Sequence, residues 1–337
     1  MRAVPLTGEG PALAVADVED PQPGPGEVVL RVTGCGICGS DLHVAKAMAA
    51  PGVVLGHEIA GVIDEIGSGV EGWAAGRAVT GRPLAGCGAC RWCARGRPDH
   101  CASFELVGFQ RPGGFAERTV LRADELFALP AGLTGPEQAL VEPFAVARRG
   151  LRRGALEPGE HVAVLGAGPI GLAAAHWARA LGAGHIVVSD PVERRRELAL
   201  ALGADLAVEP AELAAAAGAP SLVVECSGSP GVLDQALQLA DVDGRVAVVG
   251  ICSTPDTYLP WWGISKELDV RFSIFYGRED FTDTIDAFDR GALRPGEMIT
   301  ETVSLDELPE RFARLLADPD AGKVVVVPYA RAGRPFV

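Results

Sequence analysis

The sequence predicts an α/β protein of two domains, one of which contains a doubly wound parallel sheet. Three observations support this fold class. The 337 residues are enough for two domains with sizeable cores. Residues 146–277 alternate short apolar strands with helices, whereas residues 1–145 are rich in turns and strands. A glycine-rich turn at residues 166–171 joins an apolar strand directly to a helix.

Residues 1–145 contain two clear strand signals. Val28–Val32 and Ile59–Ile63 are apolar runs rich in β-branched side chains, and glycine and proline punctuate the sequence around them. We therefore expect a first domain made mainly of strands and turns.

Residues 146–277 are predicted to form βαβ units. Gly182 and Gly203 follow two of the expected helices, as glycine commonly does at helix ends. Alternation at this pace indicates right-handed crossovers and a parallel sheet. The expected strands are residues 161–165, 186–189, 222–226, 245–249 and 268–275, and the expected helices are residues 169–181, 193–202 and 232–240.

Residues 278–337 carry two amphipathic helix patterns, 280–290 and 305–317, and a short strand at 323–327. The composition shifts near residues 145 and 278, so we expect domain limits at these two places.

The composition restricts the partners. A net charge of −14 disfavours nucleic acid and anionic membranes. The chain has no apolar signal segment and no apolar stretch of spanning length, so we expect a cytoplasmic protein. The reducing cytoplasm favours metal-bound over disulfide-bonded cysteines. An anionic cofactor is compatible with the charge, because a helix N-terminus can hold a phosphate locally.

Four cysteines indicate a bound metal in a polar stretch, residues 85–103, that cannot form a core of its own. They are Cys87, Cys90, Cys93 and Cys101. Four convergent thiolates favour one tetrahedral Zn²⁺ that holds the stretch together. A ferredoxin-type iron–sulfur run has a shorter last gap and a following proline, whereas Ala102 follows the last cysteine. Two disulfides are the remaining alternative.

The glycine-rich turn has the Gly-x-Gly-x-x-Gly spacing of a dinucleotide site. Such a turn allows close approach of the backbone to a pyrophosphate, which then faces the helix N-terminus. Glycine triplets also occur in ordinary βαβ turns, but here an acidic residue follows at the end of the next strand. The expected cofactor-binding residues are Gly166, Gly168, Pro169, Ile170, Gly171, Asp190 and Arg195.

Asp190 favours NAD over NADP. Its carboxylate is suited to accept hydrogen bonds from the adenosine ribose hydroxyls and to repel a 2′-phosphate. Arg194, Arg195 and Arg196 start the next helix and would soften this preference if they reached the ribose. A solvated helix face is the alternative for these arginines.

A second metal site is indicated upstream. Cys38 and His57 come from separate loops, and a thiolate, an imidazole and a carboxylate would leave one zinc position open for a substrate oxygen. Taken alone, His57 is more simply a core histidine. Cys35 and Cys38 have the spacing of a redox pair, but no thioredoxin-like βαβ unit surrounds them.

With these motifs in place, the chain resembles the zinc-dependent medium-chain dehydrogenases of the alcohol dehydrogenase family. The resemblance covers essentially the whole chain and is nearest to the sorbitol, threonine and butanediol dehydrogenase branch, because Glu142 stands where classical alcohol dehydrogenases carry a cysteine zinc ligand. It implies a GroES-like catalytic domain at residues 1–145, a Rossmann domain at 146–277, and a C-terminal segment, 278–337, that completes the catalytic domain.

The resemblance also implies residue roles. Cys38 and His57 match the catalytic zinc ligands, and Glu142 matches the third ligand position of the polyol branch. Glu58 matches the adjacent carboxylate, which in some members binds the zinc directly or displaces its water. Asp41 matches the carboxylate that orients the zinc histidine. Ser40 and His43 match the proton relay. Cys35 matches no ligand and is expected in the core.

We therefore predict an enzyme that holds a catalytic and a structural Zn²⁺ and transfers a hydride between NAD and a secondary alcohol, polyol or hydroxy-amino compound. The substrate is a small molecule, and we expect a homodimer or homotetramer that binds neither nucleic acid nor membrane. The alternatives are a zinc-free quinone or enoyl reductase of the same superfamily, which lacks these cysteines, and a non-catalytic NAD(H)-binding protein. The sequence leaves open the exact substrate, its pathway and the resting third ligand.

Overall fold

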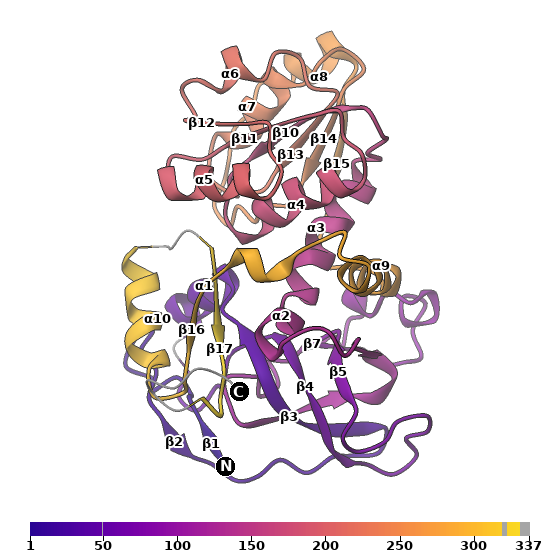
Figure 1. The fold of residues 1–337 in the computed structure, drawn as a ribbon, viewed down its shortest axis with the longest axis vertical. Coiled ribbons are helices and arrows are strands. Elements are labelled where there is room, and N and C mark those ends of the chain that lie inside the picture. Colours follow the sequence, from indigo (N-terminus) through magenta and orange to yellow (C-terminus); the bar gives the residue numbers. More distant parts are fainter. Residues whose placement is uncertain (49, 319–321, 331–337) are drawn as a thin grey trace. The chain divides into compact units, whose positions relative to one another are not determined.

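The computed structural model describes residues 1–48, 50–318 and 322–330 (Figure 1). The chain divides into two compact units. The first consists of Met1–Glu142 together with Ile299–Val337, and the second of Pro143–Met298. The first unit is therefore interrupted by the second.

The limits of the units differ from those predicted. The largest difference lies where the chain passes from the second unit back into the first. The prediction began the C-terminal segment at residue 278, whereas helix α9 (Arg278–Asp289) belongs to the second unit. The physical reason is its packing against helix α3 (Val141–Arg153). Asp283 Oδ2 accepts hydrogen bonds from Arg148 Nε at 3.0 Å and from Arg152 Nη2 at 2.8 Å. The ring centroids of Phe144 and Phe288 are 5.0 Å apart.

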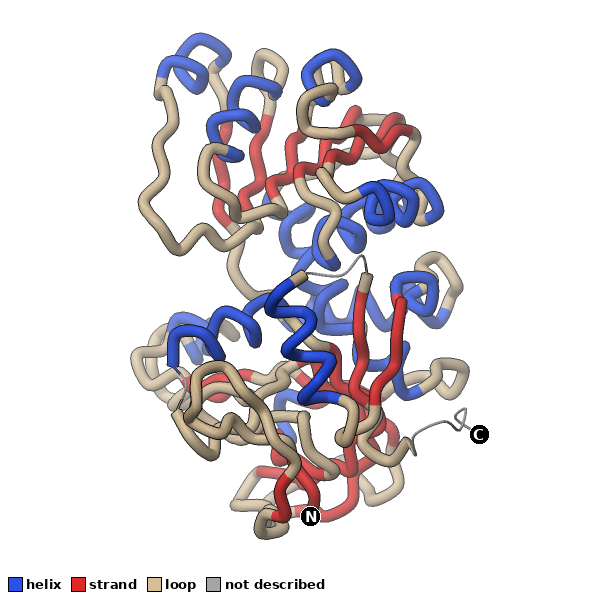
Figure 2. The backbone as a smooth tube through the Cα atoms, turned by 90° about the vertical axis from the view of Figure 1, so that its left-hand side faces the viewer, coloured by secondary structure: helices blue, strands red, loops and turns tan. Residues whose placement is uncertain are grey.

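The second unit is built on a parallel sheet. Within the described residues six strands form this sheet in the order β12-β11-β10-β13-β14-β15, with helices on both of its faces (Figures 1 and 2). The strand order reverses between β10 and β13, which makes this the place where an open α/β sheet binds its ligand. The strands are β10 (His161–Leu165), β11 (His185–Ser189), β12 (Leu206–Val208), β13 (Leu222–Glu225), β14 (Arg245–Val248) and β15 (Asp269–Phe272).

The central strands are buried because they are apolar on both faces. Val162, Val164, Val187 and Val223 are fully buried, as expected for a sheet covered by helices on each side. The predicted doubly wound sheet is confirmed. The remaining helices of this unit are α4 (Pro169–Ala180), α5 (Glu193–Ala201), α6 (Leu213–Ala216), α7 (Val232–Leu239) and α8 (Trp261–Lys266).

The first unit is mainly β. Its larger sheet runs in the order β16-β17-β3-β4-β5-β9, with β8 also paired to β3, and all of these pairs are antiparallel except β16 with β17. The strands of the whole unit, including the separate pairs β1-β2 and β6-β7, are β1 (Arg2–Ala3), β2 (Ala16–Asp17), β3 (Glu27–Gly36), β4 (Glu58–Ile66), β5 (Ala78–Gly81), β6 (Leu84–Ala85), β7 (Glu105–Leu106), β8 (Arg118–Arg122), β9 (Leu126–Ala128), β16 (Ile299–Val303) and β17 (Lys323–Val326). Its helices are α1 (Gly39–Met48), α2 (Gly135–Ala139) and α10 (Leu308–Ala317).

The pairing of β17 with β3 brings the C-terminal segment into the first unit. Val325 lies opposite Gly36 and Val326 opposite Cys35, and the Ile37 N–H donates to the Val324 carbonyl at 2.9 Å. Val324, Val326 and Phe312 are buried in the same core cluster as strand β3. The C-terminal residues thus lie beside the segment that leads into Cys38.

The helices are short. Helix α3 is the longest in the described part of the chain, with 13 residues, whereas about 20 apolar residues are needed to span a bilayer. Among the described residues no helix is long and apolar enough to cross a membrane.

Candidate metal centres and dinucleotide site

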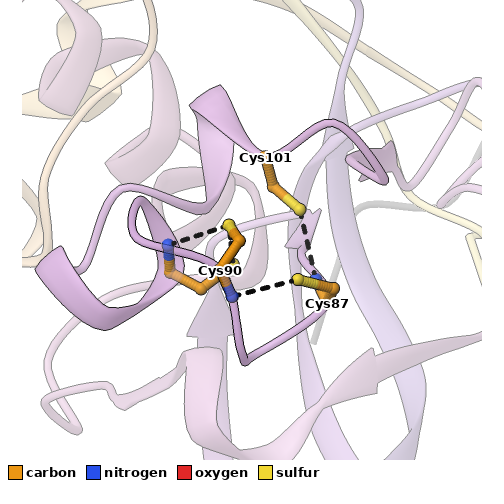
Figure 3. Close-up of side chains that lie close together, drawn as sticks. Cys87, Cys90 and Cys101 are labelled. Atoms are coloured by element: carbon orange, nitrogen blue, oxygen red, sulfur yellow. Dashed lines mark hydrogen bonds between the residues drawn. The ribbon is translucent and has the colours of Figure 1, made fainter.

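The four predicted cysteines come together in the lobe formed by residues 85–103. Their Sγ atoms all lie within 4.8 Å of one another, and Figure 3 shows three of them with their hydrogen bonds. Backbone N–H groups point at the sulfurs: Cys90 N donates to Cys87 Sγ at 3.3 Å and Cys87 N to Cys101 Sγ at 3.4 Å. All eight cysteines are free, including these four, so the two-disulfide alternative finds no support in the geometry.

Electrostatics in this lobe fit a bound cation. Hydrogen bonds from the backbone of Ala89 and Cys90 lower the pKa of Cys87 to about 6. Burial raises the pKa of Cys93 to about 11, and contacts with the thiols of Cys90, Cys101 and Cys87 add to this rise, because neighbouring thiols cannot all ionise side by side. A divalent metal removes this conflict by binding all four as thiolates, so the donor set suits Zn²⁺.

A second cluster consists of Cys38, His57 and Glu58, whose ligand atoms also lie within 4.8 Å of one another. Strand β3 ends two residues before Cys38, and β4 begins at Glu58, directly after His57. Gly56 precedes them with φ +94°, a conformation that favours glycine. Its position is crowded as well, since a Cβ there would meet the Phe115 ring at 2.6 Å. The two-strand pairing therefore places donors distant in sequence at one end of the sheet.

Asp41 lies beside His57. Its Oδ1 lies 3.3 Å from His57 Nδ1, while Oδ2 accepts a hydrogen bond from the Cys38 N–H at 2.9 Å. Burial alone would lower the pKa of His57, but the Asp41 charge raises it well above the usual value. The surroundings of the imidazole thus favour a positive charge, whether a proton or a metal ion. The ring nitrogen that faces away from Asp41, Nε2, is left for a metal.

The two carboxylate oxygens of Glu58 lie in different environments. Its Oε1 accepts a hydrogen bond from Lys323 Nζ at 2.6 Å, and both side chains are buried. Its Oε2 is buried and has no hydrogen-bond partner among the described residues. Gly36 makes room for this oxygen, because a Cβ on Gly36 would overlap it. An orphaned carboxylate oxygen beside a thiol and an imidazole is what a metal site requires.

The structure distinguishes the two candidate carboxylates by position. Glu142, in the first turn of α3, is 5% exposed, and its charge reaches the same buried Lys323. Burial alone would lower the pKa of Lys323, but Glu58, Cys38 and Glu142 raise it. The compact donor group nevertheless contains Glu58 and not Glu142. Cys35 is fully buried, as predicted, and burial raises the pKa of its thiol well above the usual value.

Helix α1 presents the two predicted relay residues. Ser40 Oγ lies 3.4 Å from His57 Nε2, so the hydroxyl is beside the donor cluster. His43 is exposed on the same helix. The Phe109 ring lies 5.3 Å from the His57 ring, which makes it an apolar neighbour of the cluster. Phe144, by contrast, is fully buried against Phe288 and is a core residue.

The glycine-rich turn has the strand–turn–helix context that the sequence predicted. β10 ends at Leu165 and α4 begins at Pro169. Gly166 has φ +94° and packs against the Ser227 backbone, and a Cβ on Gly171 would overlap the Gly166 carbonyl. Around Gly168 nothing lies within 4 Å of a built Cβ, so its backbone is open to a ligand. These are the three separate reasons for glycine in a dinucleotide turn.

Asp190 lies at the carboxyl end of β11 and is only 3% exposed. Its Oδ2 accepts a hydrogen bond from the Ala167 N–H at 2.8 Å, which ties it to the glycine-rich turn. Arg195 Nη1 lies 3.5 Å from the same oxygen, and Arg196 Nη1 donates to the Asp190 carbonyl at 2.9 Å. Two of the three arginines are thus engaged with Asp190, and Arg194 is exposed.

Sequence reasoning missed two functional candidates, Lys323 and Glu225. Glu225 ends β13 and its Oε1 accepts hydrogen bonds from the N–H groups of Ser227 and Gly228, both at 2.7 Å, so it shapes the loop that packs on Gly166. Each of these two residues has a feature in the sequence that could have indicated it. Lys323 is one of three lysines in the chain and precedes an apolar run, and Glu225 is a carboxylate at the end of a buried strand.

Two domain families match the chain. Residues 24–131 match the alcohol dehydrogenase GroES-like domain, and residues 169–290 match the zinc-binding dehydrogenase domain. The first range contains both metal clusters apart from Glu142, and the second begins inside the glycine-rich turn. Fold and donor groups together therefore define a metal-dependent dehydrogenase.

Proteins to which this chain is similar are also described as dehydrogenases. The 2-dehydro-3-deoxy-L-galactonate 5-dehydrogenase of Pseudoalteromonas atlantica is 35% identical over 319 residues, which cover 90% of this chain and 92% of that protein. An Escherichia coli CFT073 protein described as a short chain alcohol dehydrogenase (RspB), solved with NADH, has a TM-score of 0.90 at 29% identity and covers 97% and 99% of the two chains. A zinc-binding dehydrogenase from Sinorhizobium meliloti bound to NADP has a TM-score of 0.89 at 32% identity, with the same coverage.

This chain belongs to the zinc-dependent alcohol dehydrogenase family, and it is a dehydrogenase. The resemblance inferred from the motifs is confirmed, and with it the predicted combination of a GroES-like domain and a Rossmann domain.

Proposed function

We propose that this protein is an NAD-dependent dehydrogenase that interconverts a secondary alcohol and a ketone at a zinc held by Cys38, His57 and a glutamate. The observation that carries this proposal is the buried donor cluster in which Asp41 orients His57 and one oxygen of Glu58 lacks a protein partner. A zinc-free reductase would have no use for such a cluster.

The chain's residues assign the steps of the reaction. Zinc bound by Cys38, His57 and a glutamate would supply a Lewis acid that lowers the pKa of the substrate hydroxyl. Ser40, beside His57, is placed to accept the hydroxyl proton, and His43, exposed on the same helix, is placed to pass it to solvent. Asp41 keeps the imidazole in the orientation that leaves Nε2 free for the metal. The four-cysteine lobe holds the second zinc, which has a structural role.

The second unit is proposed to bind NAD at the glycine-rich turn. The N-terminus of α4 faces the pyrophosphate, and the buried Asp190 meets the adenosine ribose. Arg195 and Arg196 contact Asp190 itself, so they support its position and do not supply a free pocket for a 2′-phosphate. NAD is therefore the expected cofactor.

The proposed substrate is a small secondary alcohol, polyol or hydroxy-amino compound. The Pseudoalteromonas relative is named for oxidation of a sugar acid at carbon 5, and Phe109 offers an apolar contact near the donor cluster. The test is a screen of secondary alcohols, vicinal diols, sugar alcohols, sugar acids and β-hydroxy amino acids with NAD⁺, followed at 340 nm. Absence of turnover with every class, in protein that contains both zincs, would favour a non-catalytic NAD(H)-binding role.

We also propose a homo-oligomeric assembly in the cytoplasm. β15 is an edge strand of the six-stranded sheet, and apolar side chains on and after it are exposed: Phe272 by 64% and Ile274 by 52%. An unprotected apolar edge favours pairing with another chain. Light scattering should give at least a dimer, and Phe272→Lys should shift it towards the monomer. The reduced cysteine clusters support the cytoplasmic location.

A further inference from the structure

Lys323, a buried cation that contacts the donor cluster, has no role in the reaction described above. Lys323 starts β17, a strand that pairs with β3, and its Nζ contacts Glu58 Oε1 at 2.6 Å and the Ile37 carbonyl at 3.1 Å. Its side chain is 1% exposed. Burying an ammonium group is costly unless it is paired, so this lysine is held in place by the anions around it.

The negative charges around Lys323 explain why a cation is buried at this position. Glu58, Cys38 and Glu142 are the anionic groups that act on its ammonium. With Cys38 as a thiolate, these three groups carry one negative charge more than a divalent metal can neutralise. Lys323 supplies the missing positive charge through its contact with Glu58 Oε1, without occupying a position of a metal ligand.

The geometry of Glu58 shows how the lysine acts. Lys323 holds Oε1, and Oε2 is buried against Gly36 with no hydrogen-bond partner in the described part of the chain. A carboxylate with one oxygen engaged can give the metal only the other. If Lys323 were absent, both oxygens would be available, and a bidentate carboxylate would occupy space needed for substrate.

We propose that Lys323 is a positioning residue that limits Glu58 to a single, weakened metal–oxygen contact and so keeps one zinc position exchangeable. The proposal rests on the Cys38–His57–Glu58 metal site of the proposed function. It assigns to a residue of the C-terminal strand, 265 positions from Glu58, control over how tightly the catalytic metal is held.

The test compares wild type with Lys323→Met, Lys323→Arg and Lys323→Gln as intact, zinc-loaded proteins. The first readout is the rate at which the more labile zinc passes to a chelator. Substitution of residues that contact metal ligands commonly changes metal affinity or activity by about 10- to 100-fold. Removal of a competing cation strengthens the Glu58–metal contact, so Lys323→Met should release this zinc about tenfold more slowly and turn over more slowly. Lys323→Arg should behave as wild type.

The second readout is the visible spectrum after cobalt exchange at the labile site. In Lys323→Met we expect weaker d–d absorption, because a second carboxylate oxygen raises the coordination number above four. Adding Glu58→Gln to Lys323→Met should abolish the slower zinc release, since no carboxylate remains to be freed and the site then holds its metal weakly. Cys38→Ser provides the spectral blank. If Lys323→Met fails to fold, Lys323→Gln keeps a donor to Oε1 without the charge, so it should release this zinc more slowly than wild type while its cobalt spectrum stays that of wild type.

Zinc release at the wild-type rate or faster, together with an unchanged cobalt spectrum, in either uncharged variant would overturn the proposal. Failure of the proposed function gives a different result. In that case wild type itself would bind only the zinc of the four-cysteine lobe, and no cobalt signal would depend on Cys38.

Discussion

Asp190 is the residue that links the fold of the second unit to a choice of cofactor. Its carboxylate is buried and already accepts a hydrogen bond from Ala167 in the glycine-rich turn. A 2′-phosphate placed near this charge would be repelled, and the adjacent Arg195 is occupied with Asp190. The electrostatics at this one position therefore predict a preference for NAD.

We predict that wild type has a higher kcat/KM with NAD⁺ than with NADP⁺, and that Asp190→Ser narrows the gap by at least about tenfold, the equivalent of 1.4 kcal/mol. Arg195, released from its contact, would then be free to meet a phosphate. Steady-state kinetics with both cofactors provide the measurement. A wild type that is faster with NADP⁺ would contradict this interpretation, and Glu193→Ser on the exposed start of α5 is the matched control.

The third metal ligand is a second question at the residue scale. The sequence left Glu58 and Glu142 as alternatives, and the position of Glu58 within the donor cluster now favours Glu58. We predict that Glu58→Gln loses zinc from the catalytic site, because a neutral amide oxygen is a poorer ligand than a carboxylate. Glu142→Gln should retain it. Metal analysis after gel filtration distinguishes the two, and loss confined to Glu142→Gln would assign Glu142 as the ligand.

His176 on α4 predicts a pH dependence of stability that is independent of the metals. Its Nε2 accepts a hydrogen bond from the Arg294 N–H at 2.9 Å, and burial together with the Arg294 charge lowers the pKa of His176 to about 4. The folded protein thus holds a neutral imidazole that would protonate near pH 6.5 when unfolded. The associated stability is complete above pH 6.5 and is lost as the pH falls towards 4.

Between pH 7 and pH 4.5 this residue should cost wild type about 2–3 kcal/mol of unfolding free energy. His176→Gln keeps an acceptor for Arg294 but cannot titrate, so its stability should fall less over the same range. Urea unfolding of both proteins at the two pH values gives the change in unfolding free energy of each. Titratable groups that both proteins share contribute equally to this change, so the difference between the proteins reports on His176. Equal pH dependence in the two proteins would show that His176 does not titrate as described.

At the scale of elements, periodicity identified the parallel sheet well. The predicted strand at 161–165 and helix at 169–181 coincide with β10 and α4 within a residue. Short or irregular elements were missed. β12 has only three residues, and α1 begins with Gly39, Ser40 and Asp41, which are poor helix formers. Helix α3 contains Pro143 and Gly150, which look like breakers, although proline is tolerated in a first turn.

The four-cysteine lobe is an element whose stability should depend on its metal. Its described helical segments are single 3₁₀ turns, Cys93–Arg95 and Pro98–His100. Cys93→Ser should remove a ligand and lower Tm by several degrees, because the lobe has no core to replace it. Differential scanning calorimetry checks this result. Ser103→Ala, a change in the same lobe that leaves the four sulfurs in place, should leave Tm nearly unchanged.

At the scale of the whole molecule, the motifs predicted the kind of protein, and long-range pairing determined the details of the site. The glycine-rich turn was recognisable from its local spacing, and Cys38 and His57 were recognisable from motifs that resemble those of the family. The Lys323–Glu58 pair was not, because it depends on β17 joining β3 from the far end of the chain. The assignment of α9 to the second unit likewise depends on ion pairs with α3 that have no local signal.

The central claim is that one chain holds two zincs with different roles, one in the Cys38 cluster and one in the four-cysteine lobe. Its most direct test is the zinc content per chain of wild type and Cys38→Ser, measured by mass spectrometry on folded protein. We predict two zincs in wild type and one in Cys38→Ser, which should remain folded, bind NADH and have no dehydrogenase activity. Two zincs retained in active Cys38→Ser, or one zinc in wild type, would contradict the account.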